Sequence, residues 1–266
     1  MQLTWLDSNS WLIQTETKNI LLDPWLIGSL VFGNAPWFFS GEKQQEFSLP
    51  EKIDLILLSQ GLEDHAHIPT LEQLDHDIPV VASPNATKVV NGLGYKTVTT
   101  LEHQEKIIID NSIEIEAVPG SLVGPQLVEN GYFLTDLTNK QRLYYEPHGF
   151  HSPTIQDEGT VDIAVTPLVD FKILNLIPVL KGQKSALQLC QWLQPKVILP
   201  SGGAGDIVYK GILASILNES GSIERLRQLL QDNNLSTQIM TPQPGEKVDI
   251  SSQTLDENMR ITTEAK

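Results

Sequence analysis

The sequence has a single cysteine, few basic residues and no long apolar run. Because Cys190 is the only cysteine among 266 residues, neither an intrachain disulfide nor a thiolate metal cluster can form. No stretch approaches the ~18 uninterrupted apolar residues of a membrane-spanning helix. Residues 1–11 also lack the basic region and apolar core of a signal peptide. We therefore expect a cytoplasmic protein with no integral membrane segment.

Acidic residues outnumber basic residues. Eighteen Lys and Arg against 33 Asp and Glu leave a formal net charge of −15 at pH 7. That charge repels phosphate backbones, so nucleic acid is not an expected partner. The shares of hydrophobic residues (40%) and charged residues (19%) are typical of a globular chain and exclude a disordered one. The expected partner is a small-molecule substrate or ligand, and the sequence does not fix the oligomeric state.

Short apolar runs bounded by turn residues alternate with amphipathic stretches, and this alternation predicts an α/β fold. The predicted strands are 3–6, 11–13, 20–22, 53–58, 80–82, 97–99, 106–109, 113–118, 131–134, 142–145, 161–167, 196–199 and 237–240. The predicted helices are 69–74, 86–93, 184–193, 207–217 and 223–233, and residues 27–49 are predicted to form a long ordered loop. No linker divides the chain, so we expect one domain over residues 1–250 and a polar tail over 251–266.

Ionisable residues follow the apolar run 53–58 at once. Residues Gln60 to His65 read Gln-Gly-Leu-Glu-Asp-His, and Leu22 to Trp25 read Leu-Asp-Pro-Trp. With the N-terminal strand pattern, this order resembles the metallo-β-lactamase superfamily, in particular the branch of L-ascorbate-6-phosphate lactonase and the phospholipase D that cleaves N-acyl phosphatidylethanolamines. The similarity extends from Met1 to about Met240. It implies a four-layer αββα sandwich of two mixed β-sheets.

The resemblance also implies where metal ligands would lie. Members of the superfamily carry His-x-His-x-Asp-His after the buried strand, which helps to hold two zinc ions that share a water. On that frame only Asp64 and His65 match, because Gln60 and Leu62 replace two histidines and Pro147 replaces a bridging aspartate. The two more distant histidines are expected within residues 120–122 and 200–202, which contain none. We therefore expect the ordinary dinuclear zinc site to be missing.

Histidine and carboxylate side chains are nevertheless concentrated in two loops. Glu146 and His148 lie two residues apart, so both would point to one side of an extended segment. One interpretation is a rebuilt mononuclear centre of Asp64, His65, Glu146 and His148 that holds Zn, Fe or Mn. A second has no metal and uses His65 or His148 as a general base, oriented by Asp64 or Glu146. In a third interpretation, these side chains have no catalytic role and form a hydrogen-bonded cluster that fixes the conformation of the loops.

The functional prediction is a hydrolase-like protein with one divalent metal or none. Its expected catalytic residues are Asp64, His65 and His148, with water as the nucleophile. The alternative is a non-catalytic protein on the same fold that binds a small ligand or acts as a scaffold. Further residues expected to line the pocket are Asp23, Gln60, His67, His151 and Ser201.

Lys172, Lys181 and Lys184 lie close together in a chain that is otherwise acidic. Such a positive patch either receives an acidic group of a substrate or is simply a solvated face. The sequence alone does not decide between the two.

Overall fold

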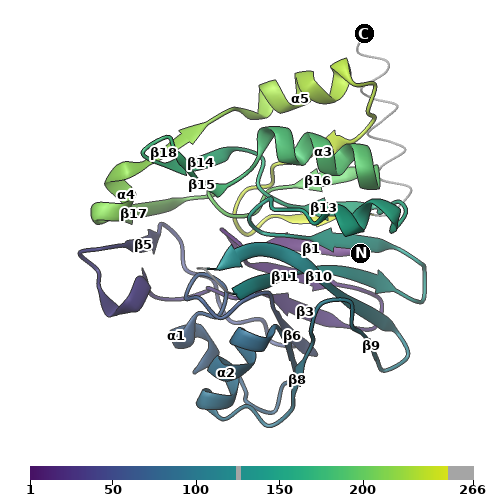
Figure 1. The fold of residues 1–266 in the computed structure, drawn as a ribbon. Helices are drawn as coiled ribbons and strands as arrows, with labels where there is room; N and C mark the ends of the chain where they lie inside the picture. Colours follow the sequence, from purple (N-terminus) through teal and green to yellow (C-terminus); the bar gives the residue numbers. More distant parts are fainter. Residues whose placement is uncertain (124–126, 251–266) are drawn as a thin grey trace.

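The computed structural model describes residues 1–123 and 127–250, so the predicted tail 251–266 lies outside the described residues. Two seven-stranded sheets pack face to face, and helices cover their outer faces (Figure 1). This is the αββα sandwich that the sequence predicts. Within the described residues, no helix has the length and apolarity needed to cross a membrane.

The N-terminal sheet combines an antiparallel and a parallel half, in the strand order β20-β1-β2-β3-β6-β7-β8. Its strands are β1 (Gln2–Trp5), β2 (Trp11–Gln14), β3 (Asn19–Leu22), β6 (Leu55–Leu58), β7 (Val80–Ala82), β8 (Val98–Thr100) and β20 (Lys247–Asp249). Strands β3, β6, β7 and β8 run parallel to one another. The side chains of β6 are all buried, as expected for a parallel strand covered on both faces.

The second sheet has the order β19-β16-β13-β12-β11-β10-β9 and is also mixed. Its strands are β9 (Lys106–Ile109), β10 (Ile113–Val123), β11 (Leu127–Asp136), β12 (Arg142–Tyr145), β13 (Ile163–Val165), β16 (Val197–Leu199) and β19 (Gln238–Ile239). Asp110 and Asn111, between β9 and β10, have φ of 46° and 54°. These left-handed angles suit the tight hairpin that Asp-Asn predicts.

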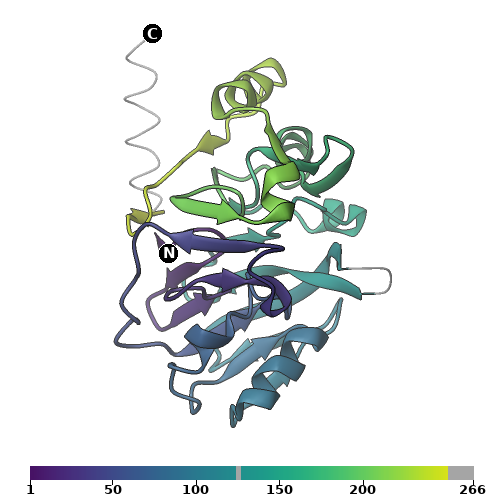
Figure 2. The same cartoon turned by 90° about the vertical axis from the view of Figure 1, so that its left-hand side faces the viewer.

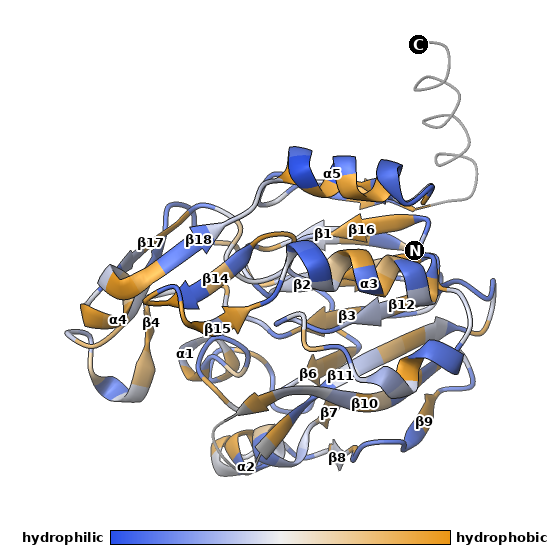
Figure 3. Ribbon diagram, turned by 45° about the horizontal axis from the view of Figure 1, so that its top comes forward, coloured by the Kyte–Doolittle hydropathy of each residue, from blue (hydrophilic) through white to orange (hydrophobic). Residues whose placement is uncertain are grey.

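Helices cover the outer faces of both sheets, so each sheet has the central core on one side and an outer core on the other. Helices α1 (Ile68–Leu71) and α2 (Pro84–Leu93) cover the N-terminal sheet, and α3 (Gln183–Leu193) and α5 (Ile223–Asp232) cover the second sheet. The central core lies between the sheets and includes Trp11, Leu57 and Tyr145. In Figure 3, β16 is orange along its length whereas α5 alternates between orange and blue, as a buried strand and a half-exposed helix should.

Two small sheets project from one end of the sandwich (Figure 2). One contains β15, β14 and β18, and the other contains β17, β5 and β4. The elements of this region are β4 (Leu30–Val31), β5 (Ser40–Lys43), β14 (Asp170–Ile173), β15 (Ile177–Leu180), β17 (Ile207–Lys210), α4 (Ile212–Ile216) and β18 (Leu217–Ser220). The described residues also form two 3₁₀ helices, Phe32–Asn34 and Pro153–Asp157.

Two predictions are wrong in this region. The predicted loop 27–49 contains β4 and β5, and the predicted helix 207–217 is divided among β17, α4 and β18. Residues 207–210 alternate in burial and pair antiparallel with β5, so long-range pairing overrides their helical pattern. Gly211, with φ of 102°, then separates the strand from the short helix α4.

Candidate functional site

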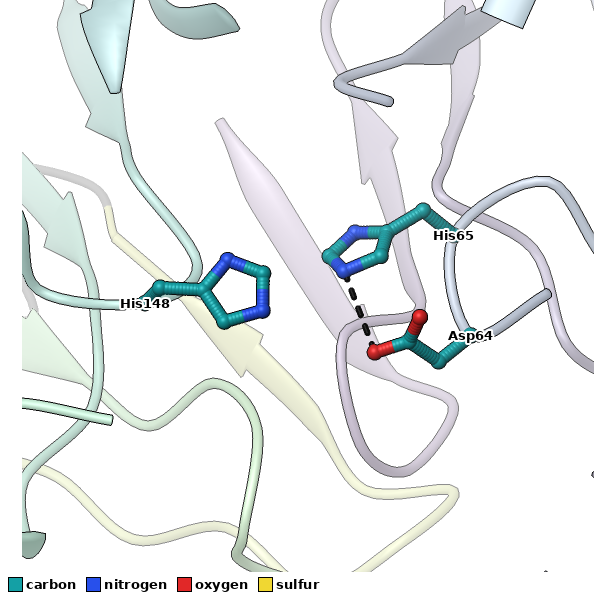
Figure 4. Close-up of side chains that lie close together, drawn as sticks. All are labelled: Asp64, His65 and His148. Atoms are coloured by element: carbon teal, nitrogen blue, oxygen red, sulfur yellow. Dashed lines mark ion pairs between the residues drawn. The ribbon is translucent and has the colours of Figure 1, made fainter. Parts of the chain in front are cut away.

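The candidate site lies where loops from both sheets meet at one edge of the sandwich (Figure 4). Asp23 directly follows β3, and His65 lies in the loop after β6, the parallel neighbour of β3. His148 lies in the loop after β12 of the second sheet. Because β3 and β6 are parallel neighbours, their loops begin at the same edge of one sheet, and the packing of the two sheets brings the His148 ring to within 5.0 Å of the His65 ring, centroid to centroid.

The buried carboxylate of Asp23 fixes the ring of His65. Asp23 Oδ2 lies 2.7 Å from His65 Nδ1, and both side chains are fully buried. The same carboxylate accepts hydrogen bonds from the Ser59 backbone N–H (2.8 Å), the Ser59 hydroxyl (2.5 Å) and the Tyr145 hydroxyl (2.6 Å). Asp23 thus ties β3, β6 and β12 together and leaves His65 Nε2 facing the site.

His65 Nε2 faces two groups of opposite character. Asp64 Oδ2 lies 3.2 Å away and Asn9 Nδ2 lies 3.3 Å away. The backbone N–H of Gly202 donates to Asn9 Oδ1 (2.8 Å), so the amide presents its NH₂ group to the ring. Burial lowers the pKa of His65, but the carboxylates of Asp64 and Asp23 outweigh burial and hold that pKa well above its ordinary value. The two carboxylates therefore favour a positive charge on the His65 ring, which a proton or a metal ion can supply.

His148 approaches from the opposite sheet with its ring held in a similar way. Its Nδ1 lies 2.8 Å and 3.0 Å from the two carboxylate oxygens of Glu129 on β11. Glu129 is fully buried and also accepts hydrogen bonds from Gln60 Nε2 (2.9 Å) and the Ser121 backbone N–H (3.0 Å). The His148 ring faces His65, with ring centroids 5.0 Å apart.

Asp64 completes a group of three candidate metal ligands. One ligand atom from each of Asp64, His65 and His148 lies within 4.8 Å of the other two. Burial alone would raise the pKa of Asp64, but His65 and then His148 lower it overall, so the carboxyl group is ionised. Its Oδ1 is buried and has no hydrogen-bond partner among the described residues. An ionised carboxylate with an unpartnered oxygen, grouped with two oriented imidazoles, fits a bound cation.

Glu146 belongs to a different group, with Glu129 and His148. Its oxygens accept hydrogen bonds from the backbone N–H groups of His148 (3.3 Å) and Phe150 (2.7 Å). Burial, and then the Glu129 carboxylate, raise the pKa of Glu146 well above its ordinary value, which favours the neutral form of this side chain. The structure therefore places Glu146 apart from Asp64 and His65, where it shapes the loop that carries His148.

Gln60, Ser201 and His67, which the sequence also predicts to line the pocket, are not among the three candidate metal ligands. Gln60 is buried and holds Glu129, and the Ser201 hydroxyl donates to the carbonyl of Pro147 (3.0 Å). The His67 ring lies 3.0 Å from Thr70 Oγ1, outside the group of three ligands. Burial lowers the pKa of His67 to about 4, so its ring is neutral.

An apolar cavity of about 210 Å³ opens beside Asp64 and His148. Its apolar walls are formed by Leu30, Phe32, Phe39, Phe171, Val179, Leu180, Tyr209, Leu213, Ala214 and Leu217. The polar side chains that reach it are Ser8, Asn9, Asp64 and His148, and no lysine or arginine of the described chain lines it. A small, uncharged ligand with an apolar part matches these walls.

The sequence analysis missed Glu129 and Asn9. Glu129 is an acidic side chain in a strand whose neighbours Asn130 and Tyr132 are also buried, and a charge in such a strand was the available signal. Asn9 lies 56 positions before His65 in a four-residue turn, and nothing in the sequence connects the two.

Comparisons with known proteins agree with this architecture. A family described as a beta-lactamase superfamily domain matches residues 2–201.

Solved structures with a similar fold come from several organisms. An isothiocyanate hydrolase from Delia radicum gut bacteria has 16% sequence identity and a TM-score of 0.66, covering 95% of this chain and 100% of that one. A metallo hydrolase from the archaeon Ignicoccus hospitalis has 14% identity and a TM-score of 0.64, covering 93% and 97%. A diiron β-hydroxylase from Streptomyces venezuelae has 14% identity and a TM-score of 0.66, covering 93% and 53%. No curated protein matches. At these identities the structural likeness concerns the fold.

Proposed function

The chain belongs to the beta-lactamase superfamily, and we propose that it is a hydrolase whose centre holds one divalent metal ion at Asp64, His65 and His148. The observation that carries the proposal is the grouping of one ligand atom from each of Asp64, His65 and His148 within 4.8 Å of the others, with Asp64 Oδ1 left without a hydrogen-bond partner among the described residues. The Nδ1 atom of each histidine is engaged by a buried carboxylate, Asp23 for His65 and Glu129 for His148. Outer carboxylates of this kind orient histidine ligands in metal sites and raise their basicity.

A single ion is proposed because the other expected ligand positions cannot serve. The side chains of Leu62 and Pro147 offer no lone pair. The oxygens of Glu129 and Glu146 already accept hydrogen bonds, from Gln60 and from backbone N–H groups. A second ion there would have to break these bonds.

In this centre, each group of residues has a separate role: binding the ion, orienting a ligand or holding the substrate. Two imidazoles and one carboxylate suit Zn, Fe or Mn, and such an ion supplies Lewis acidity toward a substrate oxygen and toward water. Asn9 and Gly202 fix the side of the His65 ring that faces the site, and Asp23 fixes the other side. The apolar cavity holds a small neutral substrate and limits the access of bulk water.

A hydrolysis assay tests this function. The substrates are small uncharged esters, lactones, amides and an aryl isothiocyanate, the last because a structural relative is an isothiocyanate hydrolase. We expect chelation to abolish the rate and readdition of Zn, Fe or Mn to restore it. Asp64→Asn should lower kcat/KM by at least ~100-fold, whereas Asp54→Asn, which alters an acidic residue outside the site, should leave it unchanged.

Two results would count against the proposed function. A rate that survives both chelation and Asp64→Asn would favour the centre without metal. Failure to hydrolyse any member of the panel would favour the non-catalytic protein that binds a small ligand.

A further inference from the structure

A second cavity of about 1070 Å³ lies between α3, α5 and the loop that follows His148. It shares no lining residue with the cavity beside Asp64. Four basic side chains line it, Lys172, Lys181, Lys184 and Arg225, and we call it the basic groove. Lys172 lies on β14, Lys181 in the loop between β15 and α3, and Lys184 in the first turn of α3, and the fold adds Arg225 from the first turn of α5.

The basic side chains of the groove lack acidic partners within the part of the chain that the structure describes. None of the four basic side chains forms an ion pair with a carboxylate of the described residues, although basic side chains elsewhere, such as Lys106 and Lys196, do. Among the described residues that line the groove, the one acidic side chain is that of Asp170, whose Oδ1 accepts a hydrogen bond from the Gly182 backbone N–H (2.9 Å). Such a concentration of unpaired cations is unexpected in a chain with a net charge of −15.

A buried polar atom at the groove also lacks a partner. The side chain of His151 is only 1% exposed, lines the groove and has an Nε2 atom with no hydrogen-bond partner among the described residues. Its Nδ1 lies 3.1 Å from the Tyr144 hydroxyl. Burial, and then the charge of Lys181, lower the pKa of His151 to about 3, so the ring is neutral. In the tautomer in which Nδ1 accepts a hydrogen bond from the Tyr144 hydroxyl, Nε2 carries the ring hydrogen. That N–H group then has no acceptor among the described residues.

The N-terminus of α3 adds to the positive potential. Helix α3 has eleven residues and begins after Gly182 with no side-chain hydrogen bond to its first turn. Residues Gln183, Lys184 and Ser185 of that turn line the groove. The free N–H groups and the helix dipole of a first turn attract anions.

We propose that the basic groove is a binding site for a phosphate group, carried by a free phosphate compound or by a lipid headgroup. Its ligands are the four basic side chains and the first turn of α3, and the buried His151 lies in the wall of the groove beside them. A dianion with several acceptor oxygens matches this set of charges and donors. The site is separate from the proposed hydrolytic centre and does not depend on it.

Isothermal titration calorimetry of the full chain with inorganic phosphate and pyrophosphate, at constant ionic strength, tests the proposal. We expect saturable binding that the double variant Lys181→Gln/Lys184→Gln weakens by at least ~10-fold. Arg225→Gln is a second, single-site test on another helix. The matched control Lys88→Gln/Lys140→Gln removes the same charge from two exposed lysines outside the groove and should bind as the wild type does. Thermal unfolding of each variant checks that it is folded.

Sedimentation with phosphatidylcholine vesicles, with and without phosphatidic acid, distinguishes the two sources. Binding to phosphate or pyrophosphate in solution indicates a free phosphate compound, and binding only to phosphatidic acid vesicles indicates a lipid headgroup. The proposal is overturned if neither probe binds, or if the groove variants and the control variant lose binding equally.

Discussion

Asp23→Ala is expected to lower the free energy of unfolding by about 3 to 5 kcal/mol, the range for breaking a buried charged network. Asp23 is fully buried and accepts hydrogen bonds from Ser59, His65 and Tyr145. Its removal leaves these buried donors without an acceptor, and each unsatisfied group costs about 1 to 3 kcal/mol. Because a typical domain is stable by only about 5 to 15 kcal/mol, the variant should be marginally folded.

Guanidinium unfolding followed by tryptophan fluorescence measures this loss. Asp54→Ala is the control, since Asp54 accepts the Asn19 backbone N–H at the edge of the same sheet and its side chain is 18% exposed. That variant should lose about 1 kcal/mol. An equal loss of unfolding free energy in the two variants would mean that the hydrogen bonds of Asp23 stabilise the fold no more than the single hydrogen bond of Asp54.

His148→Ala is expected to weaken metal binding by well over ~100-fold, because it removes one of three proposed ligands. Glu129→Gln should weaken binding by a smaller factor, about 10- to 100-fold, since Glu129 acts only by orienting the His148 ring. Competition titration with a chromophoric chelator measures both affinities.

His76→Gln provides the control for this series. The His76 ring stacks on Tyr95, away from the proposed centre, so this variant should bind metal as the wild type does. An unchanged affinity in His148→Ala would remove His148 from the proposed ligands. A larger effect of Glu129→Gln than of His148→Ala would instead indicate that the ion lies in the group formed by Glu129 and Glu146.

Much of the fold could be predicted because its strongest signals are local. The near-continuous apolar run 53–58 contains the buried parallel strand β6, and Asp110-Asn111 forms the turn of a hairpin. The segment 207–217 could not be assigned in this way. Its strand pairs with β5, where Ile207 lies opposite Lys43, and a partner so distant in sequence leaves no local trace.

The candidate site was predictable only in its loops. Sequence reasoning named Asp64, His65 and His148, and the fold brings one ligand atom of each within 4.8 Å of the others. It could not show that Glu146 lies among donors of its own loop, because an extended spacing of two residues says nothing of backbone N–H groups further along. Nor could it pair Glu129 with His148, since that contact depends on how β11 and the loop after β12 face each other.

Metal analysis of the wild-type protein, purified without an affinity tag and dialysed against buffer free of metal, tests the central claim most directly. We predict one equivalent of Zn, Fe or Mn per chain, lost in His65→Ala. Two equivalents would mean that the positions of Leu62 and Pro147 do not prevent a dinuclear site. A wild-type protein that takes up no metal, even after incubation with each ion, would contradict the proposed centre altogether.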